Sequence, residues 1–298
     1  MKMFTPMLSK QFRWLFESRI KRSRSCSSPE CRHDPTIWRL TPSVRLHGSA
    51  FCFPECLERE LLRRLQHTST ASRREQLNSC RVPLGLLMIS RGELTSEQLH
   101  EALALQKKNG TGRIGEWLQQ LGHACDVSVA AALASQWSCP VLKNIPVGVG
   151  TCTIPFHLLK TFCMAPVHFS NKRRILHMAF ADKIEYRALL VIEQMMDCKT
   201  EACLTTRSEI QAALVRMEEH GSHEEKVFER TCDPEETTRI ISSYVSTLNA
   251  PEIRVASCGE LLWARLTGAE LSENLLFSRI TGKVLQFASK KLPETISS

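Results

Sequence analysis

The chain has 298 residues with a formal net charge of +8, and 43% of its residues are apolar against 23% charged. These proportions are ordinary for a globular protein with a packed core and exclude a wholly disordered chain. No run of 18 apolar residues is present, so we expect no transmembrane helix. Because the N-terminus lacks the apolar stretch of a secretory signal, we expect a cytoplasmic protein whose 13 cysteines are reduced.

Residues 1–24 are strongly basic. The first 80 residues hold 15 Lys and Arg against 7 Asp and Glu, whereas the rest of the chain holds 24 of each. The simplest interpretation of residues 1–24 is a solvated, disordered arm. Such an arm also attracts nucleic acid or anionic lipid, so nucleic acid stays a candidate partner.

Residues 25–66 contain four cysteines in the pattern C-x4-C-x20-C-x3-C, namely Cys26, Cys31, Cys52 and Cys56. Two close thiolate pairs can converge on one tetrahedral Zn(II), and a segment of this size gains stability from a metal. The sequence LERELLRRLQ after Cys56 is typical of a helix that starts at the last ligand. The pattern predicts a zinc-ribbon-like segment, although both spacers exceed the usual two residues. His33 or His47 could replace a cysteine, and four unrelated cysteines in a loop are the alternative.

Residues 67–80 are polar and indicate a linker, after which a duplicated segment begins. Residues 83–106 and 113–136 align without a gap at an offset of 30. Matching positions pair Gly85 with Gly115, Gly92 with Gly122, Leu99 with Val129, Leu103 with Leu133 and Gln106 with Gln136. Repetition of this kind indicates a duplicated supersecondary unit.

Each copy predicts a helical hairpin. Apolar residues at helical spacing follow the Leu-Gly pair, and Gly92 stands where the chain leaves that helix in a left-handed conformation. Thr95, with Gln98 three residues later, predicts the capping box of a second helix. Two such copies predict a helical repeat subdomain over residues 81–140.

The rest of the chain predicts two small mixed units. Residues 141–219 fit an α/β sandwich of order α-β-β-α-β-α, with helices at 155–162, 184–196 and 208–217 and strands at 164–169, 174–180 and 199–205. After a charged linker at 220–225, residues 228–298 predict a separate C-terminal α+β unit, with a helix at 234–249 and strands at 252–257, 260–266 and 271–280. The expected fold class is therefore α+β with several domains.

One stretch of the sequence resembles a known domain. It begins with the paired pattern of Leu-Gly, Gly, Leu, Leu and Gln and continues with IPFHLLKTF, a strand from Met164 to Val167 and ILHMAFAD. Over residues 81–218 it is similar to the N-terminal regulatory domain of type II secretion and type IV pilus assembly ATPases. Ala181-Asp182 stands where that family has Ala-Asp-Pro. In one branch of the family, two 24-residue copies of the motif bind cyclic-di-GMP, and here too the copies have 24 residues, separated by six. The resemblance also implies docking to secretion or pilus machinery.

The resemblance implies that ligand contacts come from Leu84, Gly85, Gln106, Arg113, Gly115 and Gln136. Arginine pairs with phosphate or with the O6/N7 edge of guanine, and glycine permits close backbone approach. The first copy departs from the family motif because Pro83 occupies the arginine position, and the second copy has His123-Ala124 where two aliphatic residues are expected. The alternative is that the glycines and leucines only build the bundle.

No phosphate-binding motif of the form G-x-x-x-x-G-K-[ST] is present, so we expect no nucleotide hydrolysis and no enzyme activity. The sequence favours a non-enzymatic regulatory or adaptor protein with cyclic-di-GMP as its candidate ligand. One alternative is a purely protein-binding scaffold that docks to secretion or pilus machinery. A second is a zinc-containing regulator associated with nucleic acid.

Overall fold

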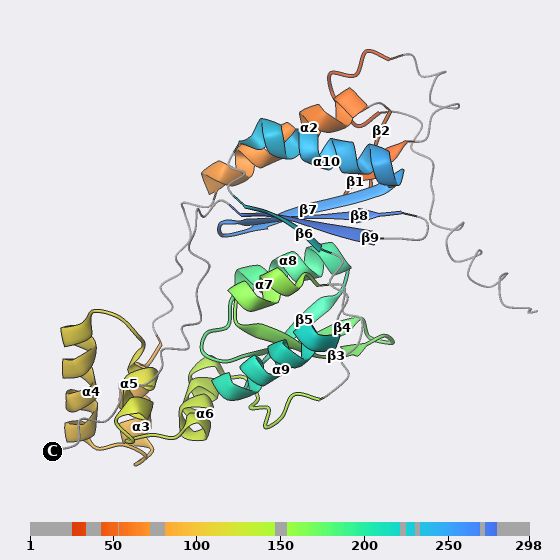
Figure 1. Ribbon diagram of the computed structural model, residues 1–298. Helices are drawn as coiled ribbons and strands as arrows, with labels where there is room; N and C mark the ends of the chain where they lie inside the picture. Colours follow the sequence, from red (N-terminus) through yellow and green to blue (C-terminus); the bar gives the residue numbers. More distant parts are fainter. Residues whose placement is uncertain are drawn as a thin grey trace, which may run out of the picture.

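The computed structural model describes residues 26–33, 43–52, 54–71, 81–146, 154–220, 225–229, 233–268 and 272–278. The basic arm expected at residues 1–24 lies outside this set. Figure 1 shows three described parts in succession: a helical bundle, an α/β unit, and a six-stranded sheet covered by two helices.

The helical bundle consists of two hairpins, as the duplicated sequence predicts. The first contains α3 (Leu84–Ser90) and α4 (Ser96–Asn109), and the second contains α5 (Ile114–Gln120) and α6 (Asp126–Trp137). Gly92 and Gly122 end the first helix of each hairpin with φ angles of 70° and 72°, which glycine adopts without steric cost. Thr95 and Gln98 exchange side chain–backbone hydrogen bonds of 2.9 and 3.3 Å, which confirms the capping box.

The α/β unit has the element order α-β-β-α-β-α that the sequence predicts. Its elements are α7 (Phe156–Thr161), β3 (Met164–Ser170), β4 (Ile175–Phe180), α8 (Tyr186–Met196), β5 (Lys199–Leu204) and α9 (Arg207–His220). The sheet order is β3-β4-β5, with β3 antiparallel and β5 parallel to β4. Two adjacent parallel strands require a crossover connection, and α8 supplies it.

A second sheet joins strands from both ends of the described chain. Its order is β2-β1-β7-β8-β9-β6, and the strands are β1 (Val44–Leu46), β2 (Ser49–Phe51), β6 (Glu225–Glu229), β7 (Glu252–Cys258), β8 (Leu261–Thr267) and β9 (Ser272–Ser278). β1 pairs in parallel with β7, placing Arg45 opposite Glu252. The structure therefore differs from the sequence-based division into separate units at 25–66 and 228–298, because both contribute strands to one sheet.

Three of these strands have no recognisable sequence pattern. β1 and β2 have three residues each, too few to show an alternation of apolar and polar residues. β6 has no fully buried residue, so its sequence resembles a charged linker.

The linker expected at 67–80 also differs from the structure, because α2 (Pro54–Ala71) continues into it. Residues 72–80 lie outside the described residues.

Both faces of the six-stranded sheet are buried. Leu262 and Leu266 of β8 belong to the core under α2 and α10 (Pro234–Leu248), whereas Leu261 and Trp263 belong to the core of the α/β unit. Figure 1 shows α2 and α10 over one face and α8 beneath the other. The sheet and the α/β unit thus share a hydrophobic core. Among the described residues, every helix falls short of the length and apolar character that a bilayer span requires.

Candidate metal and ligand sites

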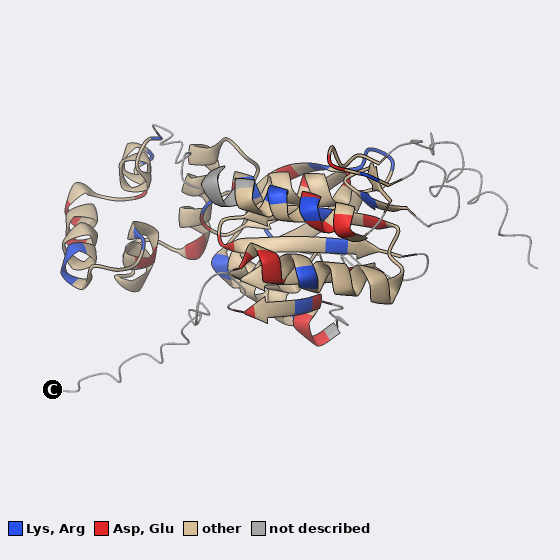
Figure 2. Cartoon of the chain, turned by 90° about the horizontal axis from the view of Figure 1, so that it is seen from above, with Lys and Arg blue, Asp and Glu red and all other residues tan. Residues whose placement is uncertain are grey.

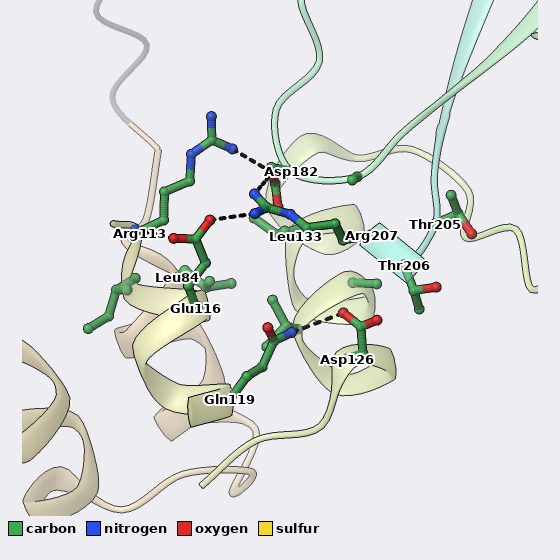
Figure 3. Close-up of a pocket in the computed structure, with 15 residues that line it drawn as sticks. Leu84, Arg113, Glu116, Gln119, Asp126, Leu133, Asp182, Thr205, Thr206 and Arg207 are labelled. Carbon is green, nitrogen blue, oxygen red and sulfur yellow. Dashed lines mark hydrogen bonds and ion pairs between the residues drawn. The ribbon is translucent and has the colours of Figure 1, made fainter. Parts of the chain in front are cut away.

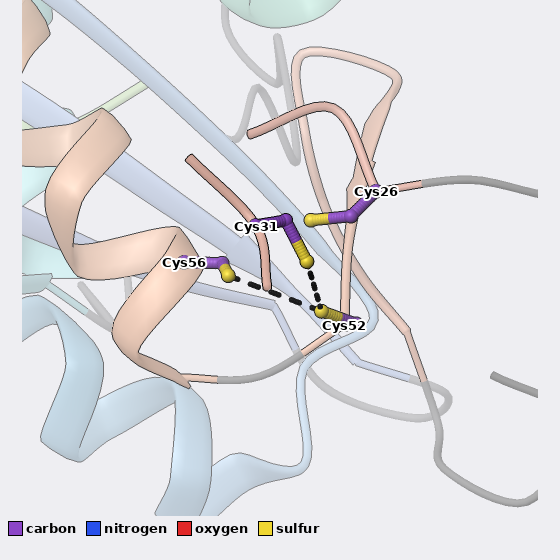
Figure 4. Close-up of side chains that lie close together, drawn as sticks. All are labelled: Cys26, Cys31, Cys52 and Cys56. Carbon is purple, nitrogen blue, oxygen red and sulfur yellow. Dashed lines mark hydrogen bonds between the residues drawn. The ribbon is translucent and has the colours of Figure 1, made fainter. Parts of the chain in front are cut away.

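Four cysteines meet at one point beside the six-stranded sheet (Figure 4): Cys26, Cys31, Cys52 and Cys56. Cys52 directly follows β2, Cys56 lies in the first turn of α2, and the other two lie on the loop before β1. The backbone N–H of Ser27 donates to the carbonyl of Ala50 over 2.9 Å and so ties that loop to β2. The structure therefore brings together the four cysteines that the sequence groups.

The spacing of the sulfur atoms suits a metal ion. All four Sγ atoms lie within 4.8 Å of one another, with Cys31 and Cys52 separated by 3.4 Å and Cys52 and Cys56 by 3.9 Å. A tetrahedral zinc–thiolate site with Zn–S distances of about 2.3 Å has sulfur–sulfur edges of about 3.8 Å. A disulfide would need its sulfurs about 2.05 Å apart. The cluster therefore matches a tetrahedral metal site better than a disulfide.

The acidities of these thiols differ. A hydrogen bond from the backbone of His33 lowers the pKa of Cys31 to about 6. Burial raises the pKa of Cys56 to about 11, and burial also raises the pKa of Cys52. Because a bound metal ion deprotonates its thiol ligands, a cation would reverse the effect of burial on the two buried thiols. The N-terminal position of Cys56 in α2 further favours its thiolate through the helix dipole.

A second candidate site is a cavity between the helical bundle and the α/β unit (Figure 3). Its volume is about 170 Å³. The bundle contributes residues from the starts of α3 and α5 and from α6, and the α/β unit contributes residues that follow β4 and β5. The lining residues that bear on function are Leu84, Arg113, Gly115, Glu116, Asp182 and Arg207.

A network of ion pairs crosses this cavity. The guanidinium of Arg113 lies 2.9 Å from Oδ2 of Asp182. Arg207 lies 2.8 Å from Oε1 of Glu116 and also pairs with Asp182. Glu116 in turn accepts a 3.1 Å hydrogen bond from the backbone N–H of Arg113 at the start of α5. The bundle therefore contributes one cation and one anion to this network of ion pairs, and so does the α/β unit.

Arg207 remains a cation in this environment. Burial acts to lower the pKa of Arg207, but the hydrogen bond to Asp182 and the charges of Asp182 and Glu116 outweigh it and raise that pKa. Burial and the charge of Asp182 both raise the pKa of the Cys163 thiol, which lies within reach of the same charges. Arg207 thus keeps its positive charge in the cavity wall, where it pairs with Asp182 and Glu116.

The cavity contains three of the six residues that the family resemblance implies as ligand contacts: Leu84, Arg113 and Gly115. The other three make contacts within the bundle. Gln106 Nε2 donates to the carbonyl of Gly112 over 2.9 Å, and Gln136 Nε2 donates to the carbonyl of Val82 over 2.6 Å. A Cβ atom on Gly85 would lie 2.4 Å from Cδ1 of Leu99, so this glycine permits close packing of α3 on α4.

Sequence reasoning missed three members of the network: Glu116, Asp182 and Arg207. From the sequence, Asp182 is only a position in a family motif. The spacing of Arg113 and Glu116 at a helix start is a signal that indicates a capping pair. Arg207 has no comparable local signal, because both of its partners are distant in the sequence and meet it through tertiary packing.

No family model matches the chain, and no curated protein matches it. Among solved structures, MshE with cdg (cyclic-di-GMP) is 23% identical at a TM-score of 0.39, over 46% of this chain and 99% of that one. The N-terminal domain of XpsE is 20% identical at a TM-score of 0.35, over 45% of this chain and 92% of that one. Each of these matches covers somewhat less than half of this chain and more than nine tenths of the other.

Proposed function

We propose that the chain is a non-enzymatic regulatory or adaptor protein whose junction cavity binds a phosphate group of cyclic-di-GMP. The supporting observation is that Arg113 and Arg207, from two parts of the molecule, converge on one cavity. Guanidinium groups bind phosphate through paired hydrogen bonds and also bind the O6/N7 edge of guanine. Gly115 lies beside Arg113 in the cavity wall, but a Cβ atom there would meet Val129 and Leu84, so its lack of a side chain serves the packing of α5 on α6.

A bound phosphate would replace Asp182 or Glu116 as the partner of the arginines. The side chain of Arg113 is 57% exposed, and exposed ion pairs contribute about 0–1 kcal/mol, so such an exchange costs little. The cavity of about 170 Å³ is smaller than the roughly 300–1,000 Å³ of typical small-molecule sites, which suits one phosphate group better than a whole dinucleotide. Because the network joins the bundle to the α/β unit, ligand binding would alter the contacts between them.

Calorimetric titration of cyclic-di-GMP into the full chain tests this proposal. We expect micromolar or tighter binding, weakened at least tenfold in Arg113→Ala, since loss of a charged hydrogen bond costs about 1.5–3 kcal/mol. Arg91→Ala is the matched control, because Arg91 lies in the same bundle and pairs with Glu93 at 3.1 Å outside the cavity. A folded wild-type sample that gives no heat would contradict the proposal.

We also propose that the cysteine cluster holds one structural Zn(II). Cys52 and Cys56 are buried in the core that contains Leu57 of α2 and Ile253 of β7. A metal at this point would hold the short β1–β2 hairpin and the start of α2 against the rest of the sheet. Mass spectrometry of the full chain should find one zinc per chain, and a chelator should lower its melting temperature. A metal-free chain with an unchanged melting temperature would contradict the zinc site. Thiolate ligands require reduced cysteines, so a cytoplasmic location is part of this proposal.

A protein-binding scaffold that docks to secretion or pilus machinery is the second candidate function. The contacts of Gly85, Gln106 and Gln136 within the bundle favour it, because these residues then need no ligand to account for them. A scaffold would give no heat with cyclic-di-GMP and would form a stable complex with a machinery protein.

The nucleic-acid alternative depends on residues 1–24, which lie outside the described residues. Figure 2 shows basic and acidic residues interspersed over the described elements.

A further inference from the structure

We infer that His33 and Cys26 compete for one coordination position, so that the zinc site has five donors for four positions. This inference rests on the proposed zinc site. The observation behind it is the position of the imidazole of His33. Its Nδ1 atom lies 3.7, 3.6 and 3.9 Å from the sulfur atoms of Cys31, Cys52 and Cys56.

These distances fit a zinc site with three sulfur ligands and one nitrogen ligand. With Zn–S distances of about 2.3 Å and Zn–N distances of about 2.0–2.1 Å, a tetrahedral site places nitrogen and sulfur about 3.5 Å apart. The measured separations are within a few tenths of an ångström of this value. The imidazole would bind through Nδ1 with its proton on Nε2, the neutral form in which Nδ1 carries a free lone pair.

Cys26 is the ligand that His33 replaces in this arrangement. Cys26 also completes a tetrahedral set, because its sulfur lies within 4.8 Å of the other three. Cys26 and His33 are half-buried on the loop before β1, whereas Cys52 and Cys56 are buried and belong to the core under α2. The loop residues can therefore exchange without disturbing the core, and the buried cysteines cannot. When neutral His33 binds in place of the Cys26 thiolate, the net charge of the site becomes less negative by one.

Zinc content of full-chain variants tests the shared position. We expect one zinc per chain in Cys26→Ser and also in His33→Ala, because each variant keeps four donors. The double variant Cys26→Ser/His33→Ala should lose the metal. Cys52→Ser, which removes a buried ligand that has no substitute, should lose it as well. Loss of zinc from either single loop variant, or its retention in the double variant, overturns the inference.

X-ray absorption at the zinc edge identifies the ligands directly. Cys26→Ser should show three sulfurs at about 2.3 Å, one nitrogen at about 2.0–2.1 Å and the outer-shell scattering of an imidazole. His33→Ala should show four sulfurs and no imidazole. A Cys26→Ser spectrum without imidazole scattering overturns the inference while leaving the zinc site in place. A folded wild-type chain without zinc overturns the site itself, so the two failures are distinguishable.

Discussion

The two copies of the repeat form equivalent contacts, and the glutamine at the end of each copy bonds to the residue directly before the other copy. Gln106 at the end of the first copy donates to the carbonyl of Gly112, directly before the second copy. Gln136 at the end of the second copy donates to the carbonyl of Val82, directly before the first. The two acceptors are separated by the same 30 positions as the two glutamines. The bundle is therefore a closed, internally symmetric pair of hairpins.

The glycines follow the same symmetry, whereas the helix starts do not. A Cβ atom on Gly85 would approach Leu99 at 2.4 Å, and one on Gly115 would approach Val129, the equivalent residue, at 3.0 Å. The first helix of the first copy starts after Pro83, but that of the second starts after Arg113. The shared positions therefore hold the bundle together, whereas the position that differs places Arg113 in the ion-pair network of the cavity.

The largest expected effect on stability is that of Gly85→Ala. Its added methyl group forces the end of Leu99 to move, and overpacking of this kind costs about 1–3 kcal/mol, which the helix preference of alanine over glycine reduces by about 0.5–1 kcal/mol. Gly115→Ala should stay within about 1 kcal/mol of wild type, because the milder contact with Val129 is offset by the helix preference of alanine over glycine, about 0.5–1 kcal/mol. Denaturant midpoints followed by circular dichroism measure both. A larger loss from Gly115→Ala than from Gly85→Ala would show that the second copy is packed more tightly than the first.

Pro83→Arg gives the first copy the arginine that the second copy has at the start of its first helix. Leu84, the next residue, already lines the cavity, and the extended backbone of Pro83, with φ of −56° and ψ of 139°, suits any residue. One added charge-assisted hydrogen bond should tighten binding of cyclic-di-GMP about tenfold, which equals about 1.4 kcal/mol. Calorimetry measures the change. Unchanged affinity would mean that the start of α3 does not reach the ligand.

The two glutamines should be equivalent. Gln106→Ala and Gln136→Ala each remove one hydrogen bond to a backbone carbonyl, and each should destabilise the chain by about 0.5–1.5 kcal/mol. Unfolding midpoints of the two variants should agree within experimental error. If Gln136→Ala left stability unchanged and abolished ligand binding instead, Gln136 would be a ligand contact and the symmetry argument would fail at this position.

The smallest effect is expected at the caps of the second helices. Thr95 caps α4 with its hydroxyl, whereas Cys125 caps α6 with a sulfur 3.4 Å from the backbone nitrogen of Ser128. Sulfur is a weak acceptor, so Cys125→Thr should stabilise α6 by a few tenths of a kcal/mol. Hydrogen exchange of the first amides of α6 should slow in this variant. Faster exchange would show that the thiol is the better cap.

Features encoded over short stretches of sequence could be predicted, and features made by distant residues could not. The capping box of Thr95 and Gln98 spans four residues, and the helices and strands of the α/β unit follow from local periodicity, so the sequence predicts them. The pairing of β1 with β7 joins residues that are about 200 positions apart, and β1 is too short for any pattern. The shared sheet therefore appears only in the structure.

The two candidate sites differ in the same way. The four cysteines are grouped by close spacing, so the sequence is sufficient to bring them together. The junction cavity depends on Asp182 and Arg207, which reach Arg113 and Glu116 only after two parts of the chain pack against each other. The family resemblance therefore implies Arg113 as a ligand residue, but the sequence gives no sign that Asp182 pairs with it.

We propose above that a phosphate replaces Asp182 or Glu116 as the partner of Arg113 and Arg207. Asp182 pairs with both arginines, so calorimetric titration of cyclic-di-GMP into Asp182→Asn and into wild type tests this exchange. Asparagine keeps the shape of the side chain and removes the competing charge, so we expect binding about tenfold tighter than wild type, equal to about 1.4 kcal/mol. Binding as weak as wild type or weaker would contradict the claim.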